Sequence, residues 1–76
     1  MKVKVMAFAR YGELLGFIEA ELPLPEPPTM DELLKHPFLA KLPPNALLAV
    51  NQRYVCRDEI LCSGDEIALM PPVSGG

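Results

Sequence analysis

The chain has 76 residues, half of them apolar, and a formal net charge of −3. A chain of this length buries only about 60% of its unfolded surface, so we expect one small domain spanning residues 1–76. Its seven Lys and Arg residues are scattered, which argues against nucleic-acid binding. Neither a membrane-length apolar run nor a signal-peptide pattern is found, so we expect a cytoplasmic protein without a membrane partner.

The first predicted strand covers residues 2–9, where apolar and polar positions alternate. Val3, Val5, Ala7 and Ala9 share one face, which favours burial. Met6 and Phe8 lie on the other face among lysines. These two side chains either form an apolar spot on the open face of a sheet or pack under a loop. The residues alone leave both alternatives open.

A turn is predicted at residues 10–16, with one helical turn from Glu13 to Leu15 that Gly16 closes. The next alternating run, residues 17–22, predicts a second strand antiparallel to the first. Its pattern places Phe17 on one face of the strand and Ile18 on the other. A proline-rich linker follows over residues 23–28.

A capping box predicts the start of a helix, because Thr29 is followed three residues later by Glu32. The helix is expected over residues 30–36, since Pro37 disfavours the helical conformation at His36. The following apolar run at residues 46–50 predicts a central strand, and residues 54–56 a short return strand.

The last strand is predicted to follow the turn at residues 63–65 and to end at Met70. The order of strands and helix predicts an α+β β-grasp (ubiquitin-like) fold. This fold is a mixed sheet of four to five strands with one main helix packed across it. The first and last strands are expected to be central and parallel. Cys56 and Cys62 lie too far apart for a Cys-x-x-Cys motif, so we expect two free thiols.

A flexible tail is predicted at residues 71–76, because Pro71 and Pro72 cannot donate hydrogen bonds to a sheet. The tail ends in Gly75 and Gly76, which bury nothing. From Met70 it can reach roughly 20 Å at about 3.3 Å per residue. A frayed terminus is one interpretation. The other is a terminus that threads a narrow passage and presents its carboxylate to a partner.

No set of side chains predicts an active site in the chain itself. His36 is the only histidine and lacks a second metal ligand or nucleophile at a suggestive spacing, and the glycines do not form a phosphate-binding loop. We therefore expect no bound cofactor or metal. The remaining special group is the Gly76 carboxylate, a poor electrophile that needs activation, most simply as an acyl-adenylate made with ATP by another enzyme. A terminus without side chains suits a confined active site.

Several segments resemble the small, sulfur-carrying subunit of molybdopterin synthase, a ubiquitin-like β-grasp family. These are Phe8-Ala9-Arg10, Glu13-Leu14-Leu15-Gly16, Ala49-Val50-Asn51-Gln52, Gly64-Asp65-Glu66-Ile67-Ala68 and Pro71-Pro72-Val73-Ser74-Gly75-Gly76. The resemblance implies that an E1-like enzyme adenylates Gly76 with ATP and that a sulfur donor protein converts it to a thiocarboxylate. The tail then delivers sulfur to a cyclic pyranopterin phosphate in the large subunit of a heterotetramer.

This resemblance also implies roles for particular residues. Val73, Ser74 and Gly75 would thread the tail into the partner. The partner interface would comprise Phe8, Tyr54, Met70, Pro71 and Pro72. The alternatives are a thiamin-type sulfur carrier, a ubiquitin-like protein modifier joined to lysines through Gly76, and a plain interaction module.

Overall fold

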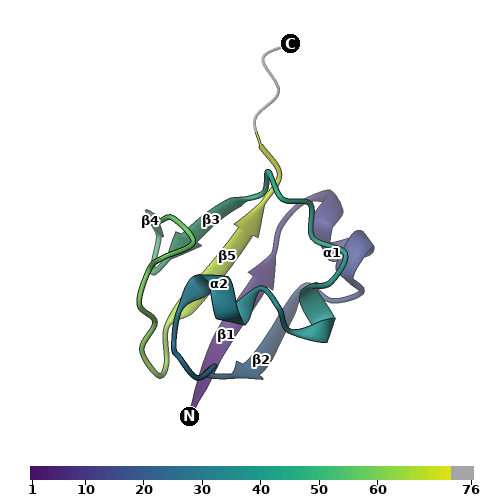
Figure 1. The fold of residues 1–76 in the computed structure, drawn as a ribbon. Helices are drawn as coiled ribbons and strands as arrows, with labels where there is room; N and C mark the ends of the chain where they lie inside the picture. The colour runs from purple at the N-terminus through teal and green to yellow at the C-terminus, as the bar shows by residue number, and fades with distance from the viewer. Residues whose placement is uncertain (73–76) are drawn as a thin grey trace.

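The computed structural model describes residues 1–72 and contains one five-stranded mixed sheet with short helices (Figure 1). Its elements are β1 (Lys2–Ala7), α1 (Arg10–Leu15), β2 (Glu19–Pro23), α2 (Met30–Leu33), the 3₁₀ turn η1 (Pro37–Leu39), β3 (Leu47–Val50), β4 (Arg53–Tyr54) and β5 (Glu66–Met70). The strand order is β2-β1-β5-β3-β4. Strands β1 and β5 are parallel neighbours near the middle of the sheet, which confirms the predicted β-grasp topology.

The hydrophobic core lies on the face of the sheet that α2 covers (Figure 1). Period-2 alternation puts Val3 and Val5 of β1 on this face, next to Ile67 and Leu69 of β5, and all four are buried. Helix α2 adds its own buried pair, Met30 and Leu33. Alternate residues of the same strands face the other way, toward the opposite face of the sheet, here called the open face. None of the described helices covers this face (Figure 1).

Strand β1 is shorter than predicted, because the backbone turns sharply after Phe8. The Phe8 N–H still donates to the Leu69 carbonyl at 3.0 Å, so its side chain keeps the alternation of β1. Ala9 then adopts φ 54° and leads into α1, which begins three residues before the predicted helical turn. Gly16 closes α1 at φ 85°, as predicted.

The predicted alternation is wrong at the start of the second strand. Strand β2 begins at Glu19, so Phe17 and Ile18 belong to the connection that precedes it. Phe17 packs against the core, whereas Ile18 is 78% exposed. The period-2 rule does not hold there, since it requires strand geometry at every position.

Helix α2 ends at Leu33, three residues earlier than predicted. Its start is as expected, because the Glu32 N–H donates to the Thr29 side chain at 3.2 Å. The His36 N–H bonds the Leu33 carbonyl, a tight three-residue turn, and His36 is extended (ψ 139°) before Pro37. The predicted main helix is thus one short helix followed by η1.

The hairpin between β3 and β4 turns through two residues with positive φ, Asn51 at 50° and Gln52 at 69°. Positive φ at both central positions is the mark of a type I′ hairpin turn. Asn51 also anchors the start of β5: its Nδ2 donates to Asp65 Oδ1 at 3.0 Å, and its Oδ1 accepts the Glu66 N–H at 3.0 Å. The return strand therefore starts at Arg53, one residue before the predicted position, and it ends at Tyr54.

We expect Asn51→Ala to lower the free energy of unfolding by about 2 kcal/mol, because it removes two hydrogen bonds and strains the positive φ. Asn51→Gly is the matched control, since it removes the same bonds and keeps the backbone unstrained. It should cost about 1 kcal/mol. Urea unfolding of both variants measures the difference. Equal stability of the two variants would contradict the role given to backbone strain.

Candidate functional site

The predicted tail begins at the carboxyl end of β5, one of the central strands. Met70 is the last paired residue of β5 and lies opposite Leu47 of β3. Pro71 and Pro72 follow outside the sheet and are half-buried. The predicted tail residues Val73, Ser74, Gly75 and Gly76 lie outside the described residues.

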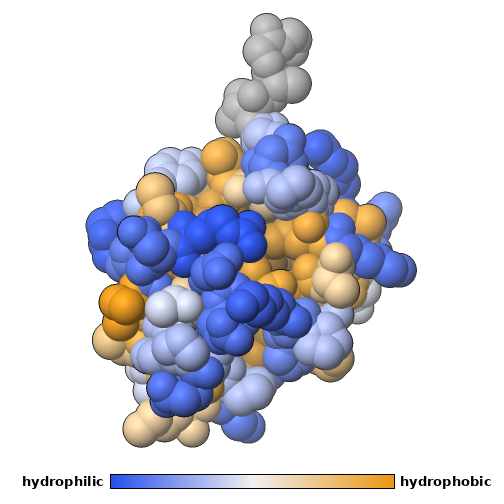
Figure 2. All heavy atoms as spheres, in the orientation of Figure 1, coloured by the Kyte–Doolittle hydropathy of each residue, from blue (hydrophilic) through white to orange (hydrophobic). Residues whose placement is uncertain are grey.

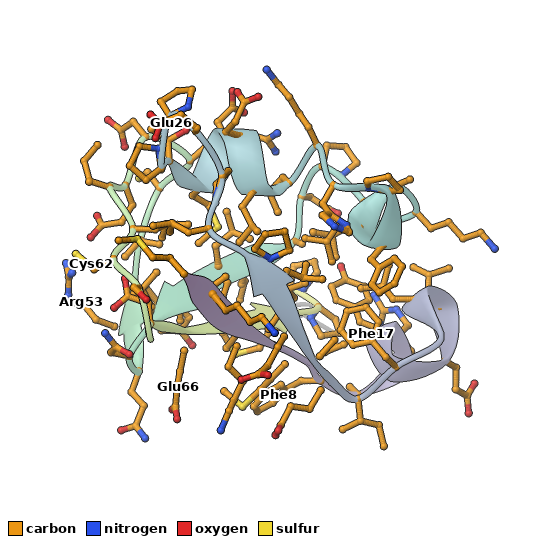
Figure 3. The ribbon with its side chains drawn as sticks, turned by 90° about the horizontal axis from the view of Figure 1, so that it is seen from below. Phe8, Phe17, Glu26, Arg53, Cys62 and Glu66 are labelled. Atoms are coloured by element: carbon orange, nitrogen blue, oxygen red, sulfur yellow. The ribbon has the colours of Figure 1, made fainter. Side chains whose placement is uncertain are left out.

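An apolar hollow of about 450 Å³ lies on the open face, and we call it the open-face hollow. It is lined by Met6, Phe8, Ala49, Gln52, Tyr54, Glu66, Ala68 and Met70. The structure therefore brings together Phe8, Tyr54 and Met70, three of the residues that the resemblance assigned to the partner interface. Figure 3 shows Phe8 and Glu66 projecting from the sheet on the side away from α2.

The register of the strands explains how this hollow forms. Met6 of β1 lies beside Ala68 of β5, and Ala68 lies beside Ala49 of β3, so small side chains form the floor. Tyr54 is paired with Ala49 and stands over the outer side, with 71% of its surface exposed. Phe8, 45% exposed, closes the opposite side. An apolar concavity with exposed aromatic walls is suited to receive an apolar side chain of another protein.

Carboxylates border the hollow on the side of β1, β2 and β5. The Lys4 Nζ lies 4.0 Å from Glu19 Oε2 and 3.8 Å from Glu66 Oε2, so one ammonium group forms ion pairs with two carboxylates. Glu21 is paired in register with Lys4 and adds a third carboxylate on the same face. The border is therefore more negative than positive, and it favours a partner with basic side chains around an apolar centre.

The other residues with reactive side chains are one histidine, which has a structural role, and two separate cysteines. His36 accepts the Phe38 N–H through Nδ1 at 3.0 Å and so caps η1. Cys56 and Cys62 are both exposed and free. Within residues 1–72, the His, Cys, Asp and Glu side chains form no group that could hold a metal ion, and no helix is long and apolar enough to span a bilayer.

Five residues of the hollow did not enter the sequence-based interface: Met6, which the alternation placed beside Phe8, and Ala49, Gln52, Glu66 and Ala68. The alternation of β5 could have indicated Glu66 and Ala68, which precede Met70 at steps of two. Gln52 gave no such signal, because its position depends on the type I′ turn.

Comparisons with known proteins agree with the β-grasp fold described above. The ThiS family model matches residues 5–76. The molybdopterin synthase sulfur carrier subunit of Dictyostelium discoideum is 42% identical, with 96% of this chain and 94% of that protein covered.

Two solved structures share the fold. One is described as a putative molybdopterin converting factor, subunit 1, from Pyrococcus furiosus. It is 35% identical, covers 96% of this chain and 99% of its own, and gives a TM-score of 0.83. The other is SAMP1 from Haloferax volcanii, a small archaeal modifier protein. It is 26% identical, is matched along the whole of both chains, and gives a TM-score of 0.80. The chain therefore belongs to the ThiS family, the ubiquitin-like β-grasp family of the molybdopterin synthase sulfur carrier subunits.

Proposed function

We propose that this chain is a cytoplasmic sulfur carrier in molybdenum cofactor (molybdopterin) biosynthesis and that Gly76 carries the sulfur as a C-terminal thiocarboxylate. The observation that carries the proposal is the likeness, over 96% of the chain, to a protein named as a molybdopterin synthase sulfur carrier subunit. The open-face hollow at the end of β5 supports it, because it supplies a docking surface beside the start of the tail.

The proposed chemistry begins with activation of the Gly76 carboxylate. A carboxylate oxygen attacks the α-phosphate of ATP in an E1-like partner, and pyrophosphate leaves. Sulfide-level sulfur (HS⁻), supplied by a donor protein, then attacks the carbonyl carbon of the acyl-adenylate. The C–O bond to AMP breaks, AMP leaves, and the product is a thiocarboxylate. ATP is bound by the activating partner and not by this chain.

The tail has the composition that such chemistry needs. In this proposal Pro71 and Pro72 lead the chain away from the sheet, because neither can extend the ladder. Val73 and Ser74 guide the tail, and Gly75 passes where a Cβ would collide. The thiocarboxylate at Gly76 then reaches the large subunit of molybdopterin synthase, where its sulfur passes to a cyclic pyranopterin phosphate.

Two partners would use the same surface. The large synthase subunit and the E1-like enzyme both need the tail in their active sites, so each would dock on the open-face hollow around Phe8, Tyr54 and Met70. They must then bind alternately. In the heterotetramer that we propose, two copies of this chain flank a central dimer of large subunits.

Intact mass spectrometry tests the proposal. The chain, co-expressed with the activating enzyme and sulfur source, should gain about 16 Da when one oxygen of the Gly76 carboxylate is replaced by sulfur. The same chain expressed without the activating enzyme is the control and should keep its original mass. An unchanged mass in both samples would contradict the proposal.

A second function is favoured by one observation, the likeness to SAMP1 along the whole chain. A protein modifier would form an amide between Gly76 and lysine side chains of other proteins. It would appear in the same experiment as conjugates of higher mass. A thiamin-type carrier would show the same gain in mass as the proposed function, so a molybdopterin synthase assay with the large subunit must separate these two.

A further inference from the structure

A second hollow lies around the outer edge of the sheet, and we call it the edge groove. It has a volume of about 660 Å³, and most of its lining is apolar. Leu34 follows α2, Leu42 and Pro43 follow η1, and Leu48 and Val55 come from β3 and the end of the hairpin. Figure 2 looks onto the face that carries α2. On this face hydrophobic residues, in orange, are exposed between hydrophilic residues, in blue.

Tyr54 connects the edge groove to the open-face hollow, because it contributes to the lining of both. Its strand, β4, has only two residues and pairs with β3 on one side. Among the described strands, β4 is one of the two edge strands of the sheet, at the end opposite β2. A protein seated in the open-face hollow against the exposed Tyr54 ring is therefore next to the entrance of the edge groove.

The charges at the edge groove indicate the chemistry of its occupant. Arg57 is already paired, since its Nε lies 3.0 Å from Asp31 Oδ1. Asp58 also lines the groove and forms no ion pair with the described residues. A carboxylate on an apolar groove favours an apolar segment that carries a Lys or Arg side chain. The open-face hollow also has a carboxylate in its lining, Glu66, which lies 3.8 Å from Lys4.

We infer that the partner surface extends from the open-face hollow around β4 and that one apolar, basic-flanked segment of the large synthase subunit occupies the edge groove. This inference rests on the proposed function, which supplies the large subunit as the partner. Tyr54 would be enclosed on two sides in the complex. A ring enclosed in this way loses its solvent contact, which is typical of residues that dominate an interface.

The two cysteines make the inference testable, because both thiols are exposed and only Cys56 lines the edge groove. We expect the large subunit at saturating concentration to slow alkylation of Cys56 by iodoacetamide about tenfold, since a covered thiol cannot meet the reagent. Cys62 is the internal reference and should keep its rate within about twofold. Mass spectrometry of peptides quenched over time gives both rates.

Several results would overturn the inference. Equal alkylation rates at Cys56 with and without the large subunit mean that the groove stays open in the complex. Equal slowing at Cys56 and Cys62 means that the effect is not specific to the groove. Slowing of Cys56 that depends only on the concentration of the isolated chain means that a second copy is the occupant.

A matched pair of variants provides an independent measurement. Cys56→Arg places a bulky positive side chain in the groove and should weaken binding of the large subunit about tenfold in titration calorimetry. Cys62→Arg makes the same change outside the groove and should leave the dissociation constant within about twofold. Equal affinity of the two variants contradicts the inference. Absence of any binding by the unaltered chain contradicts the proposed function itself, so the two failures are distinguishable.

Discussion

Deletion of Gly76 is expected to abolish sulfur transfer to the pyranopterin while leaving the domain folded. The acceptor of the activating group is the C-terminal carboxylate, and deletion moves that carboxylate back by one residue. A displacement of roughly 3.5 Å removes the reacting atoms from in-line geometry. The free energy of unfolding should change by less than about 0.5 kcal/mol, because the hydrophobic core and the strands that the structure describes are built from residues 2–70.

Gly76→Ala is the matched variant for this deletion. It keeps a carboxylate at the same position and adds only a Cβ, so it separates the position of the carboxylate from the need for a bare terminus. We expect its adenylation rate to fall about 100-fold, as for a misplaced reacting group. ATP–pyrophosphate exchange with the activating enzyme measures this step, and urea unfolding checks the fold. Sulfur transfer that persists in the deletion variant would falsify the terminal-carboxylate mechanism.

Alternation of apolar residues was sufficient to predict the central strands. Val3 and Val5 are buried on one face of β1, and Ile67 and Leu69 match them on β5. This signal is reliable because both strands are buried on one side only, which makes a register shift costly. The parallel pairing of β1 and β5 also agrees with the predicted order of elements.

The predictions failed where the backbone leaves regular geometry. Ala9 has positive φ, which is uncommon for a residue with a Cβ, and no local pattern announces it. Its turn ends β1 early and moves the start of α1 to Arg10. Phe17 and Ile18 were misassigned for the same reason, since the alternation was extended into a connection.

The two hollows also differ in how far the sequence predicts them. Spacing within the strand placed Phe8 on the face opposite Val3 and Val5, but it did not decide whether that face is open or lies under a loop. The edge groove could not be predicted, because it joins Leu34, Leu48 and Val55, which lie far apart in sequence and meet only in the folded chain. A hollow made by separate elements depends on tertiary packing, which local periodicity does not encode.

Phe8→Ala and Met70→Ala are each expected to weaken binding of the large subunit by about 1–3 kcal/mol, the range for residues at the centre of an interface. Both side chains line the open-face hollow, and each truncation removes apolar contact area from a docked partner. The corresponding rise in the dissociation constant is about 5- to 150-fold. Titration calorimetry with purified large subunit measures this change.

Phe38→Ala is the matched control for Phe8→Ala. Phe38 is an exposed aromatic residue of η1 (55% exposed) that does not line the open-face hollow. Its loss should therefore leave the dissociation constant within about twofold. Both variants truncate a phenylalanine to alanine, one inside and one outside the open-face hollow. Comparing their dissociation constants therefore separates a local effect on binding from a general loss of stability. Unchanged affinity in both Phe8→Ala and Met70→Ala would mean that the partner docks elsewhere, and the open-face hollow would then lose its proposed role.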